Sequence, residues 1–274
     1  MAGDGLTQIA LREDDAQKII RNTGTISAEG GKIALTAGMA RGLVDALIDN
    51  SGVIEASSMT EQGGQIILSA NTVNVTGAIH ADGGSGGGQI LIGGDYKGQP
   101  IQDGLANAKN TIIHDTAQIT ANATDVGDGG NIIVWADEHT SVNGLLAARG
   151  GQNGGNGGFI ETSAKQYLQI GRETHIQVDA PHGQGGQWYL DPEDIVISDS
   201  GNDGNASTSD VATSTINATL NGGGNVTIET NSGASGNGDI TLSYANINKT
   251  VDNNDATLTL IADRHITGSY STIR

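Results

Sequence analysis

The chain contains no cysteine, only three proline residues and few aromatic residues, which make up 3% of its 274 positions. The absence of cysteine excludes disulfide bonds, thiolate metal sites and cysteine nucleophiles. The shortage of aromatic side chains argues against a compact α/β enzyme, because such a core is normally filled with aromatic bulk. We therefore expect an interior built from small aliphatic side chains in thin layers.

Basic residues are also scarce, since 13 Lys and Arg stand against 31 Asp and Glu and leave a net charge of −18. An acidic surface repels phosphate backbones and anionic lipids, so we expect no nucleic-acid partner and no membrane insertion. No stretch approaches the roughly 18 apolar residues of a membrane helix. The first residues, MAGDGLTQ, lack the basic and apolar regions of a signal peptide, which predicts an internal fragment of a longer protein.

Glycine is abundant, with 43 residues, and much of it belongs to an internal repeat. A short strand motif of the type Ile-x-Ala recurs, followed by a glycine turn and a second strand motif of the type Ile-x-Leu. The second motif occurs as GGKIALTA (30–37), GGQIILSA (63–70), GGQILIGG (87–94), GGNIIVWA (129–136), GGFIETSA (157–164) and GGQWYLDP (185–192). Alternating apolar residues indicate strands with one buried face, and ordered recurrence is typical of a solenoid.

We therefore predict an all-β fold, a parallel β-helix with loop insertions, in which equivalent aliphatic residues stack from coil to coil. One internal ladder is expected to contain Ile26, Ile54, Ile79, Ile119, Leu146 and Ile176, and a second to contain Ile33, Ile66, Ile90, Ile132 and Ile160. The longest insertion is GDYKGQPIQDGLANAKN (94–110).

In the glycine-rich stretch ADGGSGGGQILIGGDY (81–96), residues 81–88 fit a turn that joins two strands of one coil, and a strand follows. The stretch lacks the Gly-Lys-Ser/Thr of a phosphate loop and the Asp of a calcium-binding glycine repeat.

The character of the sequence changes after Pro192, which suggests three regions. Residues 1–192 are predicted to form β-helix coils, residues 193–224 a polar loop and a short helix near 213–221, and residues 225–274 further coils. The helix prediction rests on TSTINATLNGGG (213–224), where a Ser/Thr start, apolar residues four apart and a glycine stop occur together.

GGQWYLDPEDIVIS (185–198) resembles the Leu-Asp-Pro-x-x-Ile-x-Ile segment of filamentous haemagglutinin-type exoproteins of bacterial two-partner secretion. NSGVIEA, SGGGQILIGGDYKG, GDGGNIIVWADEHT and ARGGQNGGNGGFIETSAK are similar to preceding segments of that family, and NATLNGGGNVTIET and DATLTLIADRHI fit its continuation. The resemblance implies a right-handed parallel β-helix that an outer-membrane two-partner secretion transporter exports to the surface of a Gram-negative bacterium. The family's Asn-Pro-Asn-Gly-type secretion motif is missing here.

Few residues suggest catalysis or cofactor binding. Pectin-cleaving β-helices cluster acids with basic residues, and the candidate acids here are Asp137 with Glu138, Asp125 with Asp128, and Asp191 with Glu193 and Asp194. No ordered set of basic partners accompanies them, and the histidines show no metal-binding spacing. We expect no catalytic residue, no cofactor and no metal site.

The tryptophans and the glycosylation sequons are the remaining candidates. Alternation places Trp135 on the outside of its strand, which makes it a candidate carbohydrate contact, because an indole stacks on sugar rings. Trp188 is expected to cover a coil end or an inserted loop. Candidate Asn-x-Ser/Thr glycosylation sites occur at Asn74, Asn122, Asn205, Asn217, Asn225 and Asn248.

The favoured function is a structural and adhesive shaft segment of a large secreted bacterial surface protein, which attaches to a host-cell or matrix glycan or protein receptor or displays a distal adhesin or toxin. The alternative is a polysaccharide-binding or polysaccharide-cleaving β-helix protein. Neither end of the sequence carries a polar, proline-rich cap, so the isolated fragment is expected to associate end to end.

Overall fold

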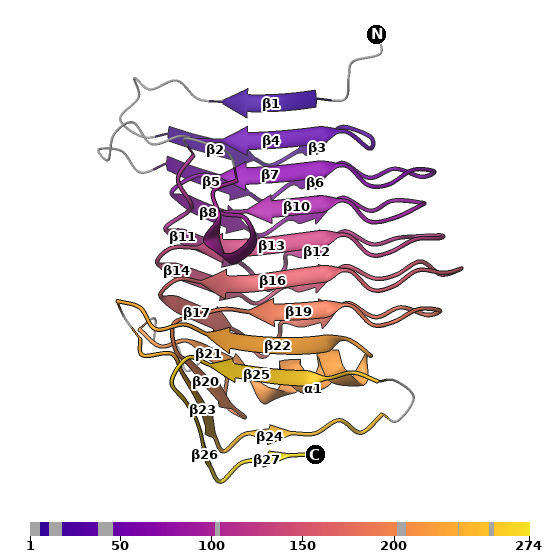
Figure 1. The fold of residues 1–274 in the computed structure, drawn as a ribbon. Helices are drawn as coiled ribbons and strands as arrows, with labels where there is room; N and C mark the ends of the chain where they lie inside the picture. Colours follow the sequence, from indigo (N-terminus) through magenta and orange to yellow (C-terminus); the bar gives the residue numbers. More distant parts are fainter. Residues whose placement is uncertain are drawn as a thin grey trace.

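The computed structural model describes residues 6–10, 18–37, 46–101, 105–201, 207–234, 236–251 and 255–274. In these residues the chain winds into a parallel β-helix, as the sequence predicts, with neighbouring strands paired in parallel. In Figure 1 the front strands run to the left and the chain returns behind them one level lower, so the winding is right-handed.

Three long sheets form the faces of the helix. In spatial order, sheet A consists of β1 (Leu6–Ala10), β4 (Lys32–Thr36), β7 (Gln65–Ser69), β10 (Gln89–Ile92), β13 (Asn131–Ala136), β16 (Phe159–Ala164), β19 (Gln187–Leu190), β22 (Asn225–Thr230) and β25 (Leu258–Ala262). Sheet B consists of β2 (Lys18–Asn22), β5 (Ala46–Asn50), β8 (Thr72–Val75), β11 (Asn110–Ile113), β14 (His139–Val142), β17 (Tyr167–Ile170), β21 (Asp210–Ala212), β20 (Ile195–Ser198), β23 (Asp239–Ser243) and β26 (His265–Ser269).

Sheet C is shorter and contains β18 (His175–Gln177), β15 (Leu145–Ala147), β12 (Gln118–Thr120), β9 (Ala78–His80), β6 (Val53–Glu55) and β3 (Thr25–Ser27). Further along the chain, β24 (Asn246–Ile247) pairs with β27 (Thr272–Ile273). The glycine turns that lead from sheet C to sheet A project as stacked fins on the right side of Figure 1.

Both predicted aliphatic ladders are confirmed in register. Ile26, Ile54, Ile79, Ile119, Leu146 and Ile176 pair in succession along sheet C. Ile33, Ile66, Ile90, Ile132 and Ile160 do the same along sheet A, where all five are completely buried. These inward-facing residues form one continuous core through the rod.

Trp188 extends the sheet A ladder, because it pairs with Ile160 on one side and Val226 on the other. It is 0% exposed, and its Nε1 donates to Oγ1 of Thr162 at 2.9 Å. The expectation that Trp188 covers a coil end or a loop is therefore wrong. Its position in the ladder points the indole inward, and a hydroxyl from the neighbouring coil satisfies the buried N–H.

A second ladder, made of glycine, runs along the start of the sheet A strands. An added Cβ at Gly64, Gly88, Gly130 or Gly158 would collide with the carbonyl oxygen of the equivalent glycine in the preceding coil. Glycine is needed at these positions because two backbones approach closely. Gly86 and Gly93, in the glycine-rich stretch 81–96, are needed for a different reason, because their φ values of 154° and 79° are ones that other residues rarely adopt. Residues 81–88 join β9 to β10, as predicted, and residues 89–92 form β10 itself.

The region after Pro192 departs from a simple solenoid. In a simple solenoid β20 would pair directly with β17. Instead β21, which follows β20 in the sequence, lies between them, so the order in sheet B is β17-β21-β20-β23. The prediction of a polar loop over 193–224 is therefore wrong for these two strands. The alternation of apolar residues does not show the positions of β20 and β21 in sheet B, because these positions depend on which strand each one pairs with.

The predicted short helix is present as α1 (Thr213–Asn221), and it replaces a strand of sheet C between β18 and β24. Nδ2 of Asn217 donates to Asn246 O at 3.0 Å, and its Oδ1 accepts from Asn248 N at 2.7 Å. Asn221 makes the same two contacts with Asn248 O and Thr250 N. Asn217 and Asn221 are four residues apart on the helix, which is a rise of about 6 Å, and their partners are two residues apart on the extended chain, which is about 6.6 Å. The two side-chain amides are therefore spaced to bond along the segment that contains β24.

Candidate functional site

The outer face of sheet A carries an apolar stripe. Ala34, Ile67, Leu91 and Ile133 occupy successive register positions, and each is between 2% and 7% exposed. Residues 93–101, here called the strap, form the first part of the long insertion after β10 and include the short 3-10 helix η1 (Tyr96–Gly98). Ile101, at the end of the strap, packs against the stripe. Covering such a stripe contributes about 25 cal/mol for each Å² removed from water.

Trp135 points outward, as alternation predicts, but it lies beneath the strap and is only 6% exposed. An added Cβ at Gly94 or Gly98 would collide with the indole, so these glycines let the strap backbone cover the ring closely. Nε1 of Trp135 donates to Oδ1 of Asp137 at 2.9 Å. The prediction of an open sugar-stacking platform at Trp135 is thereby corrected, because the insertion occupies the space that a sugar ring would need.

Lys97 fastens the strap to coils further along the rod. Its φ of 52° is a left-handed conformation that few side chains adopt readily. Its backbone N–H donates to both carboxylate oxygens of Glu161 on β16, at 3.2 Å each. Its Nζ lies 3.0 Å from Oε2 of Glu229 on β22. The strap therefore links the coil that contains β10 to coils several levels away.

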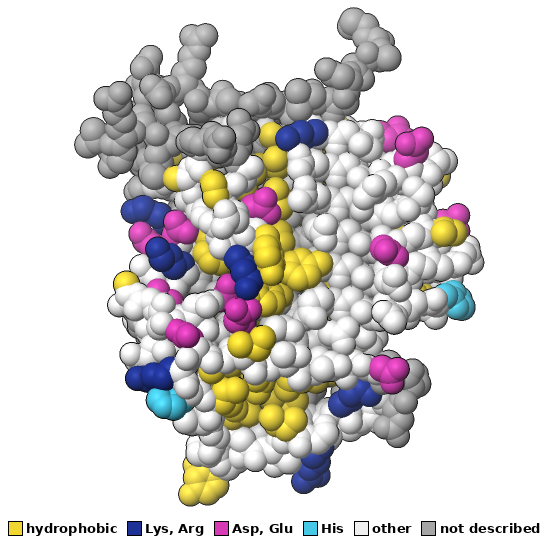
Figure 2. All heavy atoms as spheres, viewed as in Figure 1, with side chains coloured by type: hydrophobic (Ala, Val, Ile, Leu, Met, Phe, Trp, Pro, Cys, Tyr) yellow, Lys and Arg dark blue, Asp and Glu magenta, His cyan; other side chains and the backbone are white. Residues whose placement is uncertain are grey.

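Aromatic rings pack around the same lysine. The ring centroids of Tyr96 and Phe159 are 5.7 Å apart in an edge-on arrangement, and Tyr96 lies 6.0 Å from Tyr189. Nζ of Lys97 lies 5.0 Å from the centroid of Tyr189, a geometry that contributes about 0.5–1 kcal/mol at exposed sites and more when desolvated. Figure 2 shows hydrophobic, basic and acidic side chains gathered in the middle of this face.

Burial changes the proton affinity of the carboxyl groups below the strap. Glu161 is 0% exposed, and its burial raises its pKa from 4.5 to about 7, against hydrogen bonds that favour the charged form. Burial also raises the pKa of Asp191 from 3.8 to about 6. A hydrogen bond from Tyr189 lowers the pKa of Glu229, so Glu229 is the ionised partner of Lys97 at neutral pH.

A cleft of about 590 Å³ opens beside the strap. One wall is formed by the strap and Asn107, and the other by residues 231–234, which follow β22. The floor consists of turns from sheet A to sheet B in three successive coils, and it contains Asp137, Lys165 and residues 191–193. Small-molecule sites commonly occupy roughly 300–1,000 Å³, so the cleft is our candidate functional site.

The acids of the Leu-Asp-Pro segment build the second wall. Oε1 of Glu193 accepts a hydrogen bond from Ala234 N at 3.1 Å. Oδ1 of Asp194 accepts from Asn237 N at 2.9 Å and Asp239 N at 2.7 Å. Glu193 and Asp194, named above as candidate acids, thus hold the loop after β22 in place.

The other candidate acids lie in different parts of the molecule, and Asp128 is on a fin, where its Oδ1 accepts from Asn156 N at 2.7 Å. Asp137 and Asp191 line the same cleft, although they come from different coils. Asp125 lies on a fin, where its carboxylate accepts from Nδ2 of Asn153 at 2.6 Å. Glu138 lies 3.4 Å from Nζ of Lys109 in an exposed ion pair. Within the described residues, no group of three or more His, Asp or Glu side chains is placed to hold a metal ion.

The sequons differ in whether the asparagine amide is accessible. Glycosylation joins the sugar to Nδ2, and this atom donates hydrogen bonds in Asn74, Asn217 and Asn225. Asn122 is half-buried and accepts a bond from Arg149 N, Asn248 is exposed, and Asn205 lies outside the described residues. Among the sequons that the structure describes, Asn248 is the one with an exposed side chain.

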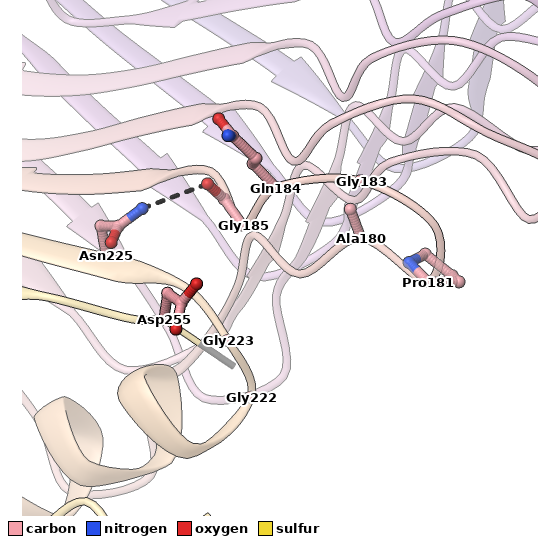
Figure 3. A pocket seen from close by; sticks show the side chains of 9 residues that line it. All are labelled: Ala180, Pro181, Gly183, Gln184, Gly185, Gly222, Gly223, Asn225 and Asp255. Carbon is pink, nitrogen blue, oxygen red and sulfur yellow. Dashed lines mark hydrogen bonds between the residues drawn. The ribbon is translucent and has the colours of Figure 1, made fainter. Parts of the chain in front are cut away.

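A larger hollow of about 710 Å³ lies where α1 interrupts sheet C. Figure 3 shows it between the 180–185 turn and the end of α1, with Nδ2 of Asn225 donating to Gly185 O at 3.1 Å. Most of its lining is backbone and small side chains, with Gln184 and Asp255 at its edges. Few polar side chains converge there, so the cleft beside the strap is the better candidate.

Sequence reasoning did not identify Lys97, Glu161 or Glu229. One signal was present, because Glu161 occupies the register position that Ile133 holds in the preceding coil. A carboxylate in an apolar stripe requires a hydrogen-bonding partner, and here the partner comes from the long insertion.

No protein-family model matches the chain. The chain is similar to the heme/hemopexin-binding protein of Haemophilus influenzae, with 32% identity over 80 residues. The match covers 29% of this chain and 8% of that protein, so the chain spans a small part of the length of the relative. None of the helices in the described residues is long and apolar enough to cross a membrane.

Proposed function

We propose that this chain is a segment of the shaft of a large secreted bacterial surface protein and that it acts through length and rigidity rather than catalysis. The observation that carries the proposal is the continuous stacking of sheet A over nine strands in the described residues. Strands stack about 4.8 Å apart, so these nine strands extend over about 38 Å. Each coil contacts mainly its neighbours, as in repeat proteins that extend by repetition.

The resemblance to filamentous haemagglutinin-type exoproteins supports export by an outer-membrane transporter and display at the cell surface. The local similarity to a heme/hemopexin-binding protein agrees with a secreted bacterial protein. We further propose an adhesive role, in which the shaft contacts a host-cell or matrix glycan or protein or presents a distal adhesin or toxin. No enzymatic activity is part of the proposal.

Deleting one coil tests the shaft proposal directly. Gly64 and Gly88 hold equivalent positions before β7 and β10, so removing residues 65–88 joins Gly64 to Gln89 and keeps the strand register. We expect a folded β-helix with unchanged circular dichroism per residue and a rod about 5 Å shorter by small-angle scattering. A globally unfolded product would contradict a modular shaft.

The adhesive and catalytic parts need separate assays. Beads coated with the native chain should attach to epithelial cells more than beads coated with the coil-deleted chain after heat denaturation. The chain should release no reducing or unsaturated sugar ends from acidic polysaccharides. Release that Asp137→Asn or Asp191→Asn abolishes would favour the polysaccharide-cleaving alternative instead, because both acids line the cleft.

A further inference from the structure

We infer that the cleft beside the strap binds a neutral, hydroxyl-rich ligand of the size of one or two sugar rings. This inference deepens the adhesive role proposed above, on which it rests, by naming a ligand class, and it is independent of the shaft proposal. The cleft is formed by two insertions against the turns of three coils, and its volume of about 590 Å³ suits such a ligand.

Asp137 and Asp191, in the floor of the cleft, each use one carboxylate oxygen in hydrogen bonds within the protein and leave the other without one among the described residues. Oδ1 of Asp137 accepts from Trp135 Nε1 at 2.9 Å and from Asn107 Nδ2 at 3.3 Å. Oδ1 of Asp191 accepts from Asn231 Nδ2 at 2.5 Å. In the described part of the chain, no hydrogen bond reaches Oδ2 of either residue. Supporting bonds of this kind orient a binding group, so both Oδ2 atoms are available to donors of a ligand.

Lys165 provides the complementary donor. Its side chain is exposed, and its Nζ has no hydrogen-bond or ion-pair partner among the residues that the structure describes. Pro192 and the edge of Trp135 add apolar surface to the same cleft. Hydroxyl groups both donate and accept, and the C–H faces of a sugar pack on apolar surface, so this combination matches a carbohydrate.

The charges of the cleft disfavour other small ligands. Lys97 and Lys165 line it and weaken the attraction of its carboxylates for a metal ion or an amine. Asp137, Asp191 and Glu193 line it as well, and within a chain of net charge −18 they repel an anion. A neutral ligand escapes both effects.

Ligand binding should depend on the ionisation of Asp191, whose pKa is raised to about 6 by burial. Below that pH the carboxyl group is protonated and its acceptor strength falls. Binding is therefore expected to be weaker at pH 5 than at pH 7.5.

The test uses the full 274-residue chain in isothermal titration calorimetry with lactose, maltotriose, cellotriose and mannotriose. Asp137→Asn and Asp191→Asn keep the side-chain shape and remove one charged acceptor each, and burial already favours an uncharged group at Asp191. Asp115→Asn is the matched control, because Asp115 is exposed in the turn between β11 and β12. Thermal melting confirms that each variant is folded.

We expect saturable binding of at least one of these oligosaccharides, weakened at least tenfold by either cleft substitution and unchanged by Asp115→Asn. Spermidine and trigalacturonic acid serve as charged probes. Absence of saturable binding by all four neutral sugars, binding that tolerates both cleft substitutions, or binding of the charged probes alone would overturn the inference.

Discussion

The buried Glu161 carboxyl group beneath the strap should make the protein less stable as the pH rises, and Glu161→Gln should remove that effect. The pKa of Glu161 is raised from 4.5 to about 7, mainly by burial. The folded state therefore holds the proton more tightly than the unfolded chain does. The stability that this group contributes is fully present below pH 4.5 and is lost as the pH rises through about 7.

The magnitude follows from the same two values. At about 1.4 kcal/mol for each pH unit, the interval from 4.5 to about 7 corresponds to about 3 kcal/mol. The Glu161→Gln side chain keeps a carbonyl oxygen for the Lys97 N–H and carries no charge. We expect the variant to exceed the parent in unfolding free energy by about 3 kcal/mol at pH 8.5, and by less than half of that at about pH 5.5.

Urea denaturation followed by circular dichroism measures the free energy at both pH values, which lie above the sequence pI of about 4.4. Hydrogen exchange of peptides that cover the strap gives a local measurement, because the Lys97 amide bonds directly to Glu161. Glu173→Gln, at an exposed position, is the control and should show no pH-dependent difference. A Glu161→Gln variant that is less stable than the parent at pH 8.5, or a difference that is independent of pH, would refute the reasoning.

Further substitutions test the ladders and the helix. Ile132→Asp places an unpaired charge where Ile132 is 0% exposed, and an unchanged urea midpoint, instead of a loss of several kcal/mol, would contradict the ladder. Gly130→Ala should lower the melting temperature because its Cβ would collide with the preceding coil, whereas Gly24→Ala, with no atom within 4 Å of the added Cβ, should not. Asn217→Ala and Asn221→Ala should each cost about 1–2 kcal/mol of local stability and speed hydrogen exchange in β24 but not in β15.

The sequence predicts the coils well because their contacts repeat at one-coil spacing. Asn22 and Asn50 bond through their side chains across 28 residues, and Gln65 and Gln89 across 24. Such contacts appear in the sequence as residues of the same type at a regular interval, which is why the ladders are predicted residue by residue. The sequence predicts the glycine turns from the ability of glycine to adopt a left-handed φ, but this is only part of the reason. Gly130 is needed because two backbones approach closely there, and its φ is not left-handed.

The candidate site cannot be predicted in this way, because its contacts join residues that are several coils apart. Lys97 bonds to Glu161 across 64 residues and to Glu229 across 132 residues, and neither separation is a coil repeat. Alternation shows that Trp135 points outward, but it cannot show that an insertion from an earlier coil covers the ring. In a solenoid the repeating residues determine the rod, whereas insertions that contact distant coils create enclosed polar space. The most informative residues for function in this chain are therefore those that interrupt a ladder, as Glu161 does, because each needs a partner that the repeat does not supply.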